Sequence, residues 1–210
     1  MKKTTVLAYA ALIGKILIYG SSSLFTRELL ATTDVLDIIA LRFLLTAAVF
    51  LLLNLFGMVK LSFKGKSFRN MLLCAVFEPI LYFIFETMGI SMTSTIIVGV
   101  ITALSPISSV LFSRIFLKER INKIQAFGLF LGIFGVLFIV IFTNKGKESS
   151  DSSVIGILFM ILAVVSGSMF SVFSRKSSEQ FKPMEISCFS SFVGCIGFNS
   201  VNIVRHTFSG

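Results

Sequence analysis

The chain has 210 residues, of which 55% are hydrophobic and 14% are charged, and its formal net charge is +9. A mean hydropathy of +0.95 excludes an ordinary water-soluble domain and indicates several membrane-spanning helices. In a soluble protein this positive charge would suggest nucleic-acid binding, but in a membrane protein it must be assigned loop by loop. We therefore expect an all-α multispanning protein that lies in the lipid bilayer and has no nucleic-acid partner.

Seven stretches are long and apolar enough to cross a bilayer, which takes about 20 residues. Lys15 interrupts the first stretch and no signal-peptidase pattern follows it, so we expect this stretch to be a retained span. The expected spans, with boundaries good to about 2–4 residues, are 7–25, 38–58, 71–90, 96–116, 124–142, 155–173 and 186–204.

Basic residues are unevenly distributed between the two sides of these spans. The N-terminus and the loops at 60–69, 114–123 and 175–182 hold 13 Lys and Arg residues, whereas the opposite side holds 5. Because Lys and Arg are enriched in cytoplasmic loops, the bias predicts a cell-membrane protein with a cytoplasmic N-terminus. With seven spans, Gly210 then lies outside.

Matching residues recur at a nearly constant distance along the chain. Asp37 and Glu185 open the second and seventh spans, Asn54 and Asn202 lie late in the same spans, and both pairs are 148 residues apart. A Gly-Ser dipeptide in the first span recurs 147 residues later in the sixth. These offsets predict a repeat of five spans, and an odd number inverts the second copy in the membrane, as in many transporters.

The repeat divides the chain into two expected units. Residues 1–145 form the first five-helix repeat, and residues 146–210 form two helices of an inverted second repeat. Copies of spans three to five would fall at about 217–290, so we expect the chain to stop after seven of ten spans.

The third span carries an unusual polar stripe. Glu78, Tyr82 and Glu86 are four residues apart, so they lie on one face of a helix. A carboxylate near the bilayer centre costs roughly 2.5–3.5 kcal/mol even on the insertion scale. Such residues normally face a cavity, a partner charge or a transport path, so we predict a substrate-binding face here. The alternative for Glu86 is an interfacial carboxylate that reaches water.

Lys15 lies about as far into the first span as Glu78 lies into the third, roughly 13 Å deep at about 1.5 Å per residue. We predict that they form an ion pair across a cavity, which offsets much of their desolvation. In the alternative, the pair only fixes helix packing. Tyr19, one turn after Lys15, forms a wall of the site or anchors the span at the interface.

Two prolines interrupt apolar spans. Pro79 and Pro106 each remove a helix hydrogen bond, so we expect kinks at both. Thr102, Ser105 and Ser109 have the spacing of one helix face. The hydroxyls of Thr102 and Ser105 either contact substrate or bond back to their own helix, and Ser109 favours helix packing.

Several classes of mechanism lack support in the sequence. The three cysteines form no CxxC motif, and His206 has no partner at metal-ligand spacing, so neither disulfides, a metal site nor a cofactor is expected. There is no phosphate-binding glycine loop and no HExxH motif, so we expect neither ATP-driven transport nor an enzyme. The seventh span has no lysine for a retinal Schiff base.

Several motifs resemble the EamA-like branch of the drug/metabolite transporter superfamily over residues 6–142, and more weakly over 154–204. The motifs are Tyr19-Gly20-Ser21-Ser22-Ser23, Ala40-Leu41-Arg42-Phe43, the stretch from Leu104-Ser105-Pro106 to Leu117-Lys118-Glu119-Arg120, Gly128, and Gly132-Ile133-Phe134-Gly135-Val136. This resemblance implies ten spans in two inverted repeats, a cavity shared between the halves, and small metabolite, amino-acid or drug-like cargo.

The resemblance also implies a structural or gating role for Arg42, which otherwise snorkels to the interface or pairs with Asp34 or Asp37. We expect close helix packing at Gly128 and Gly132, which form a GxxxG motif. We expect a secondary transporter that works by alternating access and exports its cargo. The alternatives are a non-transporting remnant, a half that needs a second copy or a complementing chain, and a receptor that only binds its ligand.

Overall fold

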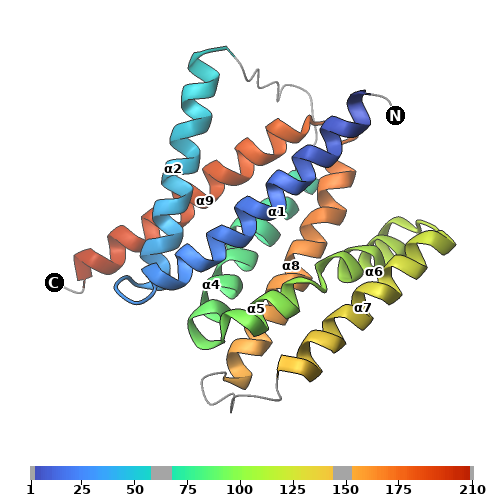
Figure 1. Cartoon of the computed structure of the whole chain (residues 1–210). Coiled ribbons are helices and arrows are strands. Elements are labelled where there is room, and N and C mark those ends of the chain that lie inside the picture. The colour runs from blue at the N-terminus through green and yellow to red at the C-terminus, as the bar shows by residue number, and fades with distance from the viewer. Residues whose placement is uncertain (1–2, 58–67, 144–152, 209–210) are drawn as a thin grey trace.

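The computed structural model describes residues 3–57, 68–143 and 153–208, and the regular structure of this part is entirely helical (Figure 1). The expectation of an all-α protein is confirmed. The loops at 58–67 and 144–152, whose charges entered the orientation prediction, lie outside the described residues. The helices are α1 Lys3–Leu29, α2 Val35–Leu55, α3 Arg69–Ala75, η1 Val76–Tyr82, α4 Phe83–Met92, α5 Thr95–Thr102, α6 Ser105–Leu117, α7 Lys123–Thr143, α8 Val154–Ser177 and α9 Pro183–Phe208.

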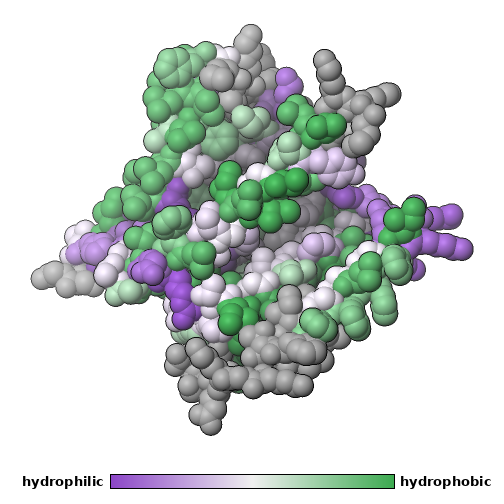
Figure 2. Space-filling model, viewed as in Figure 1, coloured by the Kyte–Doolittle hydropathy of each residue, from purple (hydrophilic) through white to green (hydrophobic). Residues whose placement is uncertain are grey.

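These helices form rods that match the seven expected spans. α3, η1 and α4 follow one another without a gap, and α5 and α6 form one interrupted rod. Five stretches of the described chain are long and apolar enough to span a bilayer: Val35–Leu55, Arg69–Met92, Thr95–Leu117, Val154–Ser177 and Pro183–Thr207. Apolar side chains cover much of the outer surface of the rods (Figure 2). The protein is therefore a multi-pass membrane protein.

Both prolines deform their rods, but in different ways. Around Pro79 the backbone widens into the π-helical segment η1, because the proline nitrogen has no hydrogen to donate. Before Pro106 the rod breaks, and this proline lies in the first turn of α6, where a missing N–H costs little. Thr102 and Ser105 consequently lie on separate helices, so the expected single face with Ser109 is not formed.

The centre of the described structure is α8, which packs against α3, η1, α4, α5 and α6 (Figure 1). Close approach there depends on glycine. A Cβ atom at Gly156 would lie 2.8 Å from the Met92 carbonyl oxygen, and one at Gly89 would lie 2.6 Å from Met160 Sδ. By contrast, Cβ atoms at Gly128 and Gly132 would meet no atom within 4 Å in the described structure, so the expected GxxxG contact is absent from this part of the chain.

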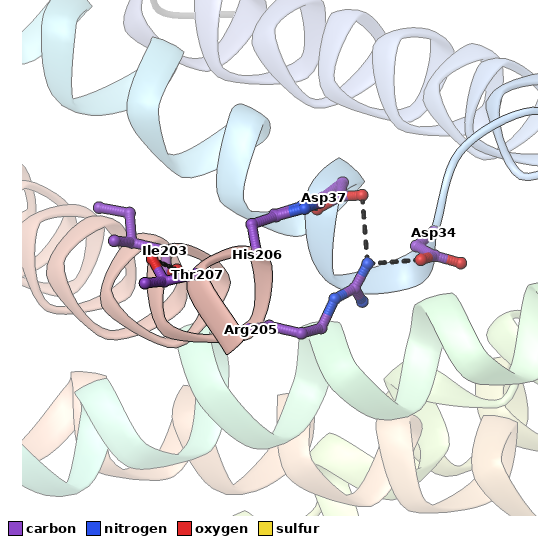
Figure 3. A network of polar contacts seen from close by, with 6 residues as sticks. All are labelled: Asp34, Asp37, Ile203, Arg205, His206 and Thr207. Carbon is purple, nitrogen blue, oxygen red and sulfur yellow. Dashed lines mark hydrogen bonds and ion pairs between the residues drawn. The ribbon is translucent and has the colours of Figure 1, made fainter. Parts of the chain in front are cut away.

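α9 lies along α2, and a polar network joins the C-terminal end of α9 to the start of α2 (Figure 3). Arg205 Nη2 lies 2.5 Å from Asp34 Oδ2 and 3.5 Å from Asp37 Oδ2. His206 Nε2 lies 3.2 Å from Asp37 Oδ1. The network therefore takes up both aspartates that the sequence offered as partners for Arg42.

We predict that Gly156→Ala destabilises the protein, because the added methyl group meets backbone as well as side-chain atoms of the turn after α4. Overpacking of this kind costs about 1–3 kcal/mol, and the thermal midpoint in detergent should fall accordingly. Gly128→Ala is the matched control, since its methyl group meets open space. Equal midpoints for the two variants would contradict this account of the contact between α8 and Met92.

The network between α2 and α9 should show a measurable but small coupling. In a double-mutant cycle of Asp37→Asn and Arg205→Ala, we expect a coupling free energy of unfolding below about 1 kcal/mol, because both side chains are partly exposed. Glu28→Gln combined with Arg205→Ala serves as the control and should be additive. Additivity in the Asp37 cycle would show that the contact does not hold the helices together.

Candidate functional site

Three polar side chains from different helices meet inside the apolar bundle. The Tyr19 hydroxyl of α1 donates to Glu86 Oε1, and its oxygen is in contact with the Tyr82 hydroxyl oxygen. The Tyr82 hydroxyl also donates to Glu86 Oε1, at 2.8 Å. Tyr82 and Glu86 are the i, i+4 pair of the expected stripe, and the structure brings Tyr19 to them from the first span.

The carboxylate at the centre of this group is buried, with 4% of Glu86 exposed. One oxygen accepts both tyrosine hydroxyls, while Oε2 has no hydrogen-bond partner among the described atoms. An unpaired buried carboxylate oxygen is costly, and in a native structure it calls for a specific explanation. The arrangement can accept a proton, a cation or a donor group of a substrate at Oε2.

α1 is attached to the rest of the bundle largely by polar contacts. Besides Tyr19, Arg27 Nη1 donates to the Thr93 carbonyl oxygen at 2.6 Å. Most large apolar side chains of α1, such as Leu17 at 69% exposed, face outward. Polar contacts of this kind can exchange partners when a helix moves, whereas interlocked apolar side chains resist such movement.

Arg42 approaches α1 from α2. Its guanidinium lies 3.4 Å from Ser22 Oγ and 3.5 Å from Thr26 Oγ1, and it lies over the Phe83 ring at 4.9 Å from the centroid. Within the described chain Arg42 has no carboxylate partner, so the expected alternative of pairing with Asp34 or Asp37 is not found. The sequence indicated a structural or gating role for Arg42, and the structure places it beside α1, where it also lines a cavity.

A cavity of about 520 Å³, open on one side, lies along α1 beside Arg42 of α2. Its lining residues are Ala11, Lys15, Ile18, Tyr19, Ser22 and Arg42. All but Arg42 come from one face of α1, at the three- and four-residue spacing of a helix. Tyr19 therefore belongs both to the cavity wall and to the buried carboxylate group.

The predicted ion pair between Lys15 and Glu78 is not formed in the described structure. Lys15 is exposed and lines the cavity, whereas Glu78 is half-buried in η1 and feels the Lys15 charge only through space. The depth argument placed Lys15 and Glu78 at the same height in the bilayer, but equal height does not fix the direction in which either side chain points.

A second cavity, of about 570 Å³, lies between α6, the start of α7 and α8. Its residues include Ser109, Ser113, Ser171, Ser174, Glu119, Arg120 and Arg175. Arg175 Nη1 lies 2.5 Å from Glu119 Oε2, and Ser109 Oγ lies 3.4 Å from Ser168 Oγ. The contact of Ser109 agrees with the packing interpretation.

Sequence reasoning missed the α8 part of this second cavity, although serines recur there at helical spacing. The candidates Thr102 and Ser105 are half-buried and line neither of these two cavities.

Comparison with known proteins agrees with this architecture. Residues 6–141 match the EamA-like transporter family. The chain is 35% identical over 203 residues to the uncharacterized transporter YcxC of Bacillus subtilis (strain 168), covering 97% of this chain and 64% of that protein. It is 26% identical over 194 residues to the uncharacterized transporter YetK of the same strain, covering 91% and 58%.

An uncharacterized transporter of Archaeoglobus fulgidus is 23% identical over 159 residues, which cover 76% of this chain and 54% of that protein. The chain thus spans less than two thirds of the length of these relatives. No solved structure matches it significantly. The family match covers well over half of the chain, in the helices that carry the buried carboxylate and the cavity. The chain therefore belongs to the EamA-like transporter family.

Proposed function

We propose that the protein is a secondary transporter that carries small metabolites, amino acids or drug-like compounds by alternating access, in the direction of export. Membership of the EamA-like family supports transport. The observation that carries the proposal is the convergence of Tyr19, Tyr82 and the buried Glu86 beside a cavity that Lys15 and Arg42 also line. Ionisable side chains inside a membrane are costly to bury, and those that occur there usually mark a substrate or ion pathway.

The contacts of α1 suit a mechanism in which one part of the bundle rocks against another. Tyr19 links α1 to Glu86, and substrate that competes for either group would loosen this link. Occupancy of the cavity would then bias the position of α1, as differential binding to two states requires. Glu78, half-buried in η1 one turn before Tyr82, is the second carboxylate on this path. Pro79 and Pro106 supply the irregular backbone on either side.

Thr102 and Ser105 flank the break between α5 and α6. In this proposal they contact a substrate only after α5 and α6 change their relative position at the break. The network of Arg205 with Asp34 and Asp37 would close the outer end of the α2–α9 pair, and it would have to open when the site faces outward.

The proposed orientation places the N-terminus in the cytoplasm and the turn between α1 and α2 outside. Thr32→Cys should therefore react with a membrane-impermeant maleimide on intact cells. Glu179→Cys, just after the C-terminal end of α8 on the proposed cytoplasmic side, should react only after permeabilisation. Both positions are exposed, whereas the native cysteines are buried or half-buried, so the unmodified protein is the blank. The reverse pattern would overturn the orientation.

We predict that Glu86→Gln abolishes counterflow of labelled amino acids and metabolites in proteoliposomes, lowering the initial rate at least tenfold, because it removes the buried charge. Membrane insertion and yield should stay unchanged, since glutamine keeps the shape and can still accept the tyrosine hydroxyls. Glu28→Gln, at the exposed end of α1, is the matched control. A wild-type rate for Glu86→Gln would remove this carboxylate from the mechanism.

A further inference from the structure

The charges around the 520 Å³ cavity narrow the class of substrate, an inference that rests on the transport function proposed above. We propose that the cavity binds an anionic group of the substrate, a carboxylate or a phosphate, between the ammonium of Lys15 and the guanidinium of Arg42. Both charged residues that line the cavity are basic, and no acidic residue of the described chain lines it.

The two carboxylates nearest to this cavity do not neutralise the cations by contact. Glu86 is held by the hydroxyls of Tyr19 and Tyr82 and forms no ion pair in the described structure. Glu78 likewise forms no ion pair within the described part of the chain. The cavity face of α1 and α2 is therefore positive, while the negative charges lie behind it on η1 and α4.

The present contacts of Arg42 leave most of its capacity unused. A guanidinium has five N–H donors, and among the described residues Arg42 makes two hydroxyl contacts, at 3.4 and 3.5 Å. The Phe83 ring adds a cation–π contact, worth about 0.5–2 kcal/mol. Charged side chains inside a membrane normally have a partner, and a carboxylate or phosphate matches the planar donor geometry of arginine.

The remaining walls suit the body of a small molecule. Ala11 and Ile18 are apolar, Tyr19 offers an aromatic ring, and Ser22 offers a hydroxyl. The cavity is an open groove along α1, since its lining residue Ile18 is 72% exposed, so a substrate would be covered on one side only. A cationic substrate would meet two like charges here and would reach Glu86 only past the tyrosine hydroxyls. The cavity thus favours one anionic group on an apolar or aromatic body.

Four probes of similar size separate the possible chemistries: benzoate, phenyl phosphate, benzamide and benzylammonium. The full chain is reconstituted in phosphatidylcholine nanodiscs, and the thermal midpoint and the dissociation constant are measured for each probe. We expect one or both anions to bind and to raise the midpoint, with the amide and the ammonium at least tenfold weaker. Lys15→Gln should weaken anion binding at least tenfold, because Lys15 is exposed and its loss should not disturb folding.

Matched variants distinguish binding at this site from non-specific attraction of anions by the positive charge of the protein. Lys123→Gln, at the exposed start of α7, should bind the anions as the wild type does. Arg42→Gln should weaken them, and Arg42→Lys keeps the charge if the glutamine variant does not fold. A further arm adds phosphatidylglycerol to the nanodiscs. Stabilisation by this lipid that depends on Lys15 would assign the site to a lipid headgroup and overturn the substrate inference.

Equal or tighter binding of benzamide or benzylammonium, or binding of no probe, would also overturn the anion site, as would unchanged anion affinity in Lys15→Gln. These outcomes differ from failure of the proposed function. Anion binding that depends on Lys15, without counterflow of any labelled compound, would leave the anion site in place and reject transport. Counterflow of neutral cargo that is unaffected by Lys15→Gln would keep transport and reject the anion site.

Discussion

The attachment of α1 to the bundle depends on one buried polar contact, in which the carboxylate of Glu86 accepts the hydroxyls of Tyr19 and Tyr82. Other helices of the bundle are held by apolar side chains that interlock. α1 presents most of its large apolar side chains outward and packs mainly against α4, so this polar contact holds it in place instead. A helix that is held by hydrogen bonds can dissociate from its neighbour when another polar group competes for the same donors or acceptors. The same contact that places α1 therefore also makes it movable, which is the physical basis of the proposed transport cycle.

The sequence was sufficient for the number of rods, the helical class and the polar stripe of the third span, because bilayer thickness fixes span length and the 3.6-residue period fixes which residues share a face. It was not sufficient for the directions of side chains. The predicted pair of Lys15 and Glu78 rested on equal depth in the bilayer, which does not fix where either side chain points. Contacts between residues far apart in the chain, such as Arg205 with Asp34, depend on packing that no local pattern contains.

The proposed repeat relates positions whose surroundings differ in the structure. Asp37 and Glu185 are 148 residues apart and each lies in the first turn of its helix. Asp37 pairs with Arg205 and His206 from another helix, whereas Glu185 accepts a hydrogen bond from the Lys182 backbone N–H at its own helix start. A carboxylate in the first turn is favourable in both places, since it faces the positive end of the helix dipole. The two carboxylates differ in their partners, because Asp37 joins α2 to α9 whereas this hydrogen bond of Glu185 lies at the start of α9 itself.

The wide turn at Pro79 also bears on the angular position of the residues that follow it. An α-helix advances by about 100° per residue, so one added residue in a regular helix would turn everything after it by about that angle. A π-helical turn holds more residues per turn and can take up such a residue locally. The wide turn at 76–82 therefore lets the rod contain a proline while Tyr82 and Glu86 still face Tyr19 of α1.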